Sequence, residues 1–202
     1  MLTQLLLALF FALRLPGRSR AYSRWKGTFP MESRGLTYIR RIAELAPLLE
    51  HADHIDVKTV VSSVDMRTFL AGMLGYRPGW LILLYVIRAG FVRLLGMRQE
   101  RLPSAFPSRP EDIPMQAGKK ASCFTVRMAK EEHYWIAAAE DRHLEALLGV
   151  VSEPLPDTSQ RRFHVLTVVH YRNWAGPVYF NVIRPFHHLV VSSMAKAGAR
   201  RL

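Results

Sequence analysis

The sequence is poor in cysteine and in acidic residues, and it has no long uninterrupted apolar run. Its single cysteine, Cys123, excludes an intramolecular disulfide and any zinc site built from several cysteines. No apolar stretch reaches the ~18 residues that a membrane-spanning helix needs. Asp plus Glu total 16 against 28 Lys plus Arg, which gives a net charge of +12. A basic protein of this kind attracts phosphate groups, whether in nucleic acid or in anionic lipid.

Several signatures of well-known enzyme classes are also missing. There is no phosphate-binding glycine loop, no Gly-x-Ser-x-Gly elbow and no His-Glu-x-x-His pair. These absences argue against a nucleotide-dependent enzyme, an α/β-hydrolase and a zinc protease, and we predict no cofactor and no metal. None of the sequence signatures of nucleic-acid recognition is present, so nucleic acid is not an expected partner despite the 22 arginines.

What the chain does contain is enough apolar material for one buried core. Half of its 202 residues are hydrophobic and 10% are aromatic, which excludes a disordered or fibrous chain. We therefore expect a single domain over residues 31–202, preceded by an extension over residues 1–30.

The extension has an apolar part followed by a basic part. Residues 1–13 are nearly all apolar, and arginines follow at Arg14, Arg18, Arg20 and Arg24. A secretory signal would carry positive charge before its apolar run instead. Two interpretations stay open: a start assigned too early, with Met31 as the first residue, or an anchor at a membrane surface. The arginines would then keep the following domain on the inner side, so we expect a cytoplasmic protein.

Hydrophobic periodicity predicts an α+β domain. Helices are expected over 36–50, 66–74, 78–95 and 174–197, and strands over 55–64, 122–129, 133–139, 142–151 and 161–171. A proline-punctuated loop is expected over 98–119. The last four strands follow one another closely, which indicates an antiparallel meander. Antiparallel sheets usually leave one face wet, and we expect the long last helix to cover the other, concave face.

Four segments carry a family resemblance: Ala52-Asp-His-Ile-Asp56, Asp141-Arg-His-Leu144, Leu166-Thr-Val-Val169, and Gly176–Val191 with its Tyr179, Ile183 and Pro185-Phe-His187. They resemble the bacterial family called domain of unknown function 2867, over about residues 48–197. Where that family often has a glycine before the Asp-Arg-His-Leu stretch, this chain has Ala137-Ala-Ala139. Its members look like the helix-grip superfamily of START lipid-transfer domains, plant pathogenesis-related allergens and polyketide cyclases.

The resemblance implies a helix-grip fold, in which a curved antiparallel sheet wraps around a long C-terminal helix and two helices follow the first strand. It also implies an apolar cavity between sheet and helix for a lipid or another hydrophobic small molecule. Binding without catalysis is the leading expectation. The candidate lining residues are Trp80, Phe124, Trp135, Tyr179, Phe186 and His187, and we expect Phe186→Arg to abolish ligand retention.

Spacing on the last helix separates two adjacent histidines. Tyr179, Ile183, Phe186, Val190 and Met194 share one face with His187, whereas Asn181, Arg184, His188, Ser192 and Lys196 form a polar face. His188 is therefore expected in solvent. His187 is expected to point toward the sheet, either against a ligand or as a structural histidine bonded to the protein itself.

Two alternatives to simple binding remain open. The first is a cyclase- or hydratase-like enzyme with His187, His143 or Tyr179 as acid–base groups. His143 and Glu145 share one strand face, where they form either such a pair or a surface ion pair. The second alternative is a membrane-peripheral module anchored by residues 1–30. The His51–Asp56 segment is dense in potential metal ligands, but no further ligands complete a site, and we interpret it as a connector.

Overall fold

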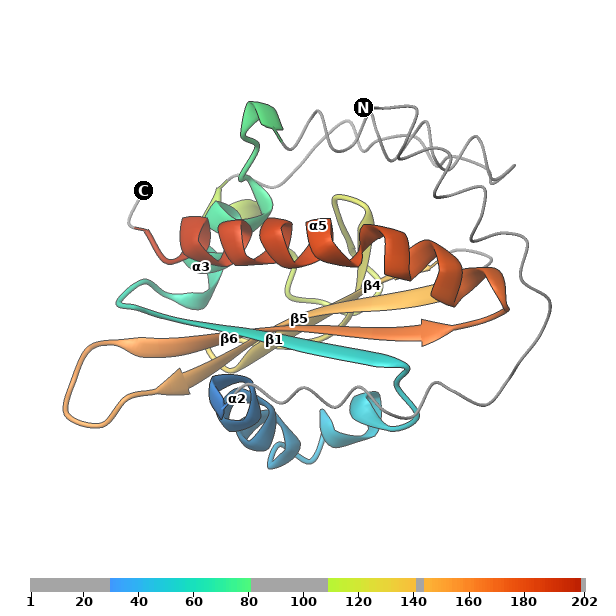
Figure 1. Cartoon of the computed structure of the whole chain (residues 1–202). Coiled ribbons are helices and arrows are strands. Elements are labelled where there is room, and N and C mark those ends of the chain that lie inside the picture. Colours follow the sequence, from blue (N-terminus) through green and yellow to red (C-terminus); the bar gives the residue numbers. More distant parts are fainter. Residues whose placement is uncertain (1–29, 81–108, 141–143, 201–202) are drawn as a thin grey trace.

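A computed structural model describes residues 30–80, 109–140 and 144–200, and it shows one antiparallel sheet between helices (Figure 1). The strands are β1 His54–Ser62, β2 Lys120–Ala121, β3 Phe124–Lys130, β4 Tyr134–Glu140, β5 Leu144–Pro154 and β6 Arg161–Tyr171. The helices are α2 Pro30–Arg40, α3 Met66–Leu74 and α5 Ala175–Gly198, with short 3₁₀ turns at Ala46–Leu49 and Pro110–Asp112.

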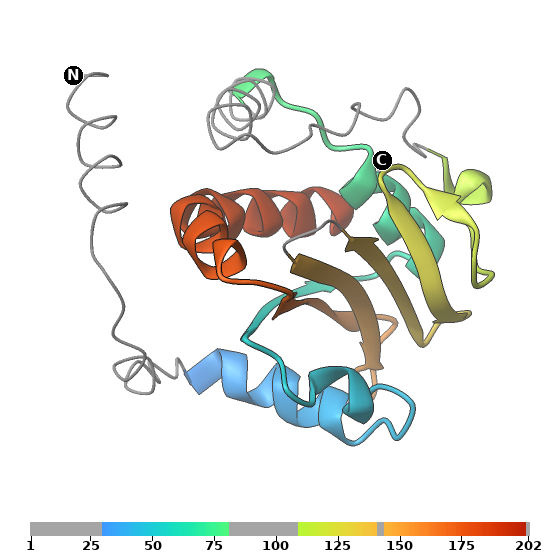
Figure 2. The same ribbon diagram turned by 90° about the vertical axis from the view of Figure 1, so that its right-hand side faces the viewer.

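The six strands lie in the order β1-β6-β5-β4-β3-β2, and every neighbouring pair is antiparallel. Strands β2 to β6 form a meander because the connections between them are short. Strand β1 joins β6, the last strand, with a register that runs from His54 opposite Val169 to Ser62 opposite Arg161. The predicted α+β class with an antiparallel sheet is therefore confirmed, and the sheet is open and curved (Figure 2).

Helices cover both faces of this sheet. Helix α5 crosses one face, and α2 lies against the other (Figures 1 and 2). Successive residues of β6 point to opposite faces. Phe163 and Val165 accordingly pack with α3 and α5, whereas Leu166 and Val168 pack with Ile39 of α2. The expectation of one wet face was wrong because α2 supplies a second apolar cover.

Local signals placed several elements correctly. Helix α3 and strand β6 have the predicted bounds, and the side chain of Asp65 caps α3 by accepting a hydrogen bond from the Thr68 amide at 2.9 Å. The helix predicted over 36–50 instead begins at Pro30 and ends at Arg40. Proline is favoured in the first turn of a helix, which agrees with the start at Pro30, and Pro47 lies instead in the first turn of the separate 3₁₀ segment Ala46–Leu49. Most of the predicted helix 78–95 and half of the predicted loop 98–119 lie outside the described residues, as do residues 1–29.

Helix α5 was predicted correctly in extent but not in orientation. Its buried residues include Phe180, Val191 and Ala195, whereas Phe186 is 46% exposed. The buried face is thus rotated by about one residue from the predicted one. Apolar side chains occur on several sides of this helix, so their spacing does not define a single face. Among the described helices, none is long and apolar enough to cross a membrane.

Candidate functional site

Polar side chains lie between β1 and α5, in the middle of the sheet–helix interface. Alternation along β1 points His54, Asp56 and Lys58 toward α5, while Val57 between them packs with the residues beneath α2. Asp56 lies opposite Thr167 of β6 and contacts His188 of α5. We call this group the polar layer; its members are His54, Asp56, Lys58, Thr167, His187 and His188.

Asp56 is the central anion of the polar layer. Only 4% of it is exposed. The Lys58 ammonium donates a hydrogen bond to Oδ1 at 2.9 Å, and Nδ1 of His188 donates to Oδ2 at 3.3 Å. Burial alone would raise the pKa of Asp56, but the hydrogen bond and charge of Lys58, together with the nearby histidines, hold that pKa below 3.8. Asp56 is therefore a carboxylate at neutral pH.

His54 and His187 are neutral at the same pH. Burial lowers the pKa of each from 6.5 to about 4. The positive charge of Arg184 adds to this effect at His54, and the attraction of Asp56 only partly opposes it. Each ring can therefore accept a proton at one nitrogen and donate a hydrogen bond from the other.

Three buried polar atoms of this layer have no hydrogen-bond partner among the described residues: His54 Nε2, His187 Nε2 and Thr167 Oγ1. Buried polar atoms are normally satisfied, and each unsatisfied one costs about 1–3 kcal/mol. Their concentration between β1, β6 and α5 needs a physical reason. A bound molecule that supplies complementary donors and acceptors is such a reason.

Apolar residues flank the polar layer on both sides. Toward the start of α5, the ring of Phe180 lies 4.8 Å from the ring of His54 and packs with Val169 and Leu144. Toward the end of α5, Val191 belongs to the larger core that includes α3. Apolar walls around a few placed polar groups are the usual character of a small-molecule site.

The arrangement supports hydrogen bonding and proton transfer. The ring of His188, which contacts the Asp56 carboxylate, lies 6.1 Å from that of His54 and 6.0 Å from that of His187, so three imidazoles are grouped beside one carboxylate. Within the described ranges, no group of three or more His, Cys, Asp or Glu side chains could hold a metal ion.

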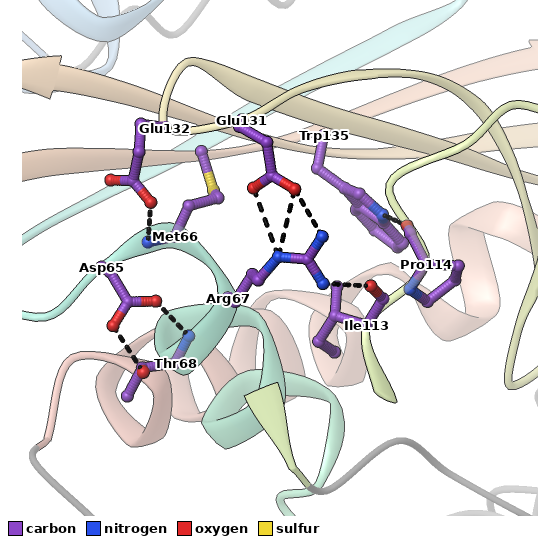
Figure 3. Close-up of polar contacts among 9 residues, drawn as sticks. All are labelled: Asp65, Met66, Arg67, Thr68, Ile113, Pro114, Glu131, Glu132 and Trp135. Atoms are coloured by element: carbon purple, nitrogen blue, oxygen red, sulfur yellow. Dashed lines mark hydrogen bonds and ion pairs between the residues drawn. The ribbon is translucent and has the colours of Figure 1, made fainter. Parts of the chain in front are cut away.

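An open pocket of about 460 Å³ lies elsewhere, between α3 and the β3–β4 turn. Its main cation, Arg67, already contacts the Glu131 carboxylate and donates to the carbonyl of Ile113 at 2.9 Å (Figure 3). The indole of Trp135 donates to the carbonyl of Pro114 at 2.9 Å in the same region. These bonds fasten the 113–114 segment to α3 and the sheet, so Arg67 already has a structural role.

A further buried histidine lies on the opposite face of the sheet, beneath α2. His164 is fully buried within β6. Its Nε2 donates to the Glu153 carboxylate at 3.0 Å, and its Nδ1 accepts from the Thr59 hydroxyl at 3.0 Å. Burial lowers the pKa of His164, which favours this neutral form. Both nitrogens are satisfied, so we assign His164 a structural role.

The structure places the six predicted lining residues in different surroundings. His187 lies in the polar layer, whereas Trp135 is fully buried in the core and Phe124 packs against that core. Trp80 is partly buried at the end of a described segment, and Phe186 is exposed. Tyr179 lies within α5, but its side chain is outside the described part, as is His143.

Sequence reasoning missed most of the polar layer. It assigned His54 and Asp56 to a connector and placed His188 in solvent, yet Asp56 accepts a hydrogen bond from His188. The overlooked signal is the alternation of His54, Asp56 and Lys58 at the start of the strand predicted over 55–64, with the apolar Ile55 and Val57 between them. Three polar residues on one face of a strand indicate either solvent or a polar site.

Comparison with known proteins adds a family and no activity. None of the curated proteins searched matches the sequence significantly. The family model described as "Protein of unknown function (DUF2867)" matches residues 48–194. This range includes β1, the whole meander, nearly all of α5 and therefore every member of the polar layer. By that match, the chain belongs to the DUF2867 family.

Proposed function

We propose that this protein binds a small molecule with an apolar body and a hydrogen-bonding group between the sheet and α5. The observation that carries the proposal is the set of three buried, unpartnered polar atoms on His54, His187 and Thr167. The ligand's polar group bonds to these atoms, and its apolar body lies against Phe180 and its neighbours.

The sheet order supports a helix-grip fold as part of the same proposal. In such a fold, the first strand pairs with the last one, and the C-terminal helix lies against the concave face. Here β1 pairs with β6 and α5 crosses the sheet (Figure 1). A ligand between sheet and helix is what the resemblance implied from the sequence. The polar layer makes a ligand with a polar head more fitting than a plain hydrocarbon.

The direct test is to purify the full chain, extract it with organic solvent and identify bound molecules by mass spectrometry. We expect a stoichiometric amphipathic molecule. Combining Thr167→Val with His187→Phe removes two of the three polar atoms while keeping side-chain volume, and retention should fall at least tenfold (about 1.4 kcal/mol). His133→Gln changes an exposed histidine and is the matched control. An empty extract from folded protein would contradict the proposal.

Phe186→Arg is now a second control. The sequence analysis expected this substitution to abolish retention, but the ring is 46% exposed. We therefore expect the variant to retain its ligand.

A proton-transfer enzyme of the cyclase or hydratase type is the second candidate. The Asp56 carboxylate holds Nδ1–H of His188, beside two neutral imidazoles that can take up a proton. The extracted ligand should be incubated with the protein in deuterated water. Deuterium incorporation at a carbon position, lost in Asp56→Asn, would establish proton abstraction. A ligand that stays unlabelled and unchanged leaves binding as the function.

A further inference from the structure

Large exposed apolar side chains lie on the outward side of α5 and at the residue directly before it. They are Trp174, Val178, Phe186 and Leu189, with 78%, 41%, 46% and 53% of each exposed. At 3.6 residues per turn, these positions fall within an arc of about 120°. Phe180, His187 and Val191, which face the sheet, lie on the opposite side. We call the four exposed residues the outer stripe.

Cations continue the outer stripe, and carboxylates are missing from this part of the sequence. No Asp or Glu follows Asp157 in the chain. Lys196 is exposed and lies seven positions after Leu189, on the same side of the helix, and the exposed Arg200 follows directly after the end of the helix. The outward side of α5 is therefore apolar along its first two-thirds and basic at its end.

We propose that this outward side of α5 docks on the surface of an anionic lipid bilayer. Apolar side chains of an interfacial helix enter the boundary between headgroups and acyl chains, and its cations pair with lipid phosphates. Tryptophan is favoured at that boundary because its ring is both apolar and a hydrogen-bond donor. A bilayer also accepts the convex side of a helix without a preformed groove, which a protein partner would have to provide.

Docking in this way places the polar layer next to the membrane. The outer stripe and the polar layer lie on opposite sides of one helix, whose diameter with side chains is about 10–12 Å. An amphipathic molecule that moves from the bilayer to the polar layer would therefore have to pass only α5. The docking surface does not depend on the ligand proposal, because its residues are different.

The test is flotation of the full chain with phosphatidylcholine vesicles, with and without phosphatidylglycerol. We expect binding to the anionic vesicles and little to the neutral ones. Trp174→Ser, Phe186→Ser and Leu189→Ser combined should lower the bound-to-free ratio at least about tenfold. Val61→Ser is the matched control, because Val61 is 47% exposed but lies on β1. Lys196→Glu with Arg200→Glu should weaken binding to anionic vesicles only.

A second measurement keeps the test decisive if the triple variant folds poorly. Leu189→Cys in a Cys123→Ser background is labelled with an environment-sensitive dye, and Val61→Cys is labelled as the control. Anionic vesicles should shift the emission of the dye at position 189 to the blue, but not at position 61. Flotation that the triple substitution leaves unchanged would assign binding to other residues, such as 1–13, and overturn the proposal. Self-association of the full chain through the stripe, without vesicle binding, would overturn it too.

Discussion

Two partly buried histidines of the polar layer, His54 and His187, are neutral in the folded protein at neutral pH, and this ties stability to pH. Their pKa in the folded protein is about 4, against 6.5 for an ordinary histidine. Between these values the unfolded chain binds more protons than the folded one. The stabilisation is therefore complete above about pH 6.5, and it is lost progressively as the pH falls toward 4.

We expect the free energy of unfolding to fall as the pH is lowered from 6.5 to 4. Urea unfolding followed by circular dichroism at several pH values measures this slope. His187→Phe should flatten it, because the variant removes one of the histidines whose pKa is lowered by burial. His133→Gln, on an exposed position, should leave the slope unchanged. A wild-type stability that stays level over this interval would contradict the burial of neutral histidines.

The contribution of the buried Asp56 charge to stability can be tested by a single substitution. Asn at this position keeps the shape but removes the charge that faces Lys58 and His188. We expect Asp56→Asn to cost about 1–3 kcal/mol of stability at neutral pH, because it weakens the hydrogen bonds of a buried charged group. Chemical denaturation provides the value. Asp157→Asn alters an exposed carboxylate in a loop and should be nearly neutral; an equal loss in both variants would argue against a special role for Asp56.

Secondary-structure elements approach one another closely where α3 crosses α5. A Cβ atom at Gly72 would lie 3.2 Å from the carbonyl oxygen of Ala197 and from Cα of Gly198. A Cβ atom at Gly198 would lie only 2.6 Å from the carbonyl oxygen of Phe69. The crossing therefore depends on glycine in both helices, because backbone atoms cannot move aside as a flexible side chain does.

Gly198→Ala should separate the two helices and destabilise the protein by about 1–3 kcal/mol. Thermal and urea unfolding measure the loss. Gly79→Ala is the matched control, since a Cβ atom at Gly79 meets nothing within 4 Å. If both alanine variants unfold at the same denaturant concentration as wild type, the packing of the α3–α5 crossing is looser than described.

At the level of secondary structure, the predictions also show which sequence signals are sufficient to locate a helix or a strand. Helix α3 has a capping aspartate and strand β6 is rich in β-branched residues over 165–169, and both were predicted with correct bounds. The buried face of α5 was predicted wrongly because Val178, Phe186 and Leu189 are apolar and yet exposed. A helix with apolar residues on both its inner and outer sides has no unique periodicity. The polar layer was missed because its residues come from β1 and α5, which are more than a hundred residues apart, and local patterns do not show which distant segments come together.

For the molecule as a whole, the second cover of the sheet lies outside the family match. Helix α2 and most of the following turn precede residue 48, yet Ile39 and Leu45 are fully buried against the sheet. Each large aliphatic side chain buried in this way contributes about 1.5–3 kcal/mol, which is considerable beside a typical total of 5–15 kcal/mol. The matched region thus lacks part of its own hydrophobic cover.

A chain that begins at His51 should therefore bind the dye ANS and unfold without a cooperative transition. A chain that begins at Met31 keeps nearly all of α2 and should unfold like the full protein. Dye fluorescence and calorimetry distinguish these outcomes. Cooperative unfolding of the shorter chain at the full-length temperature would mean that α2 adds little to the fold.

The pairing of β1 with β6 also has a consequence during synthesis. His54 lies opposite Val169, so 169 − 54 = 115 positions separate the two partners along the chain. On the ribosome, β1 emerges long before the strand that completes its hydrogen bonds. Charged residues in a strand that is still unpaired hinder its pairing with strands of other chains. Asp56 and Lys58, which the folded protein uses in the polar layer, are therefore also positioned to protect the nascent chain from aggregation.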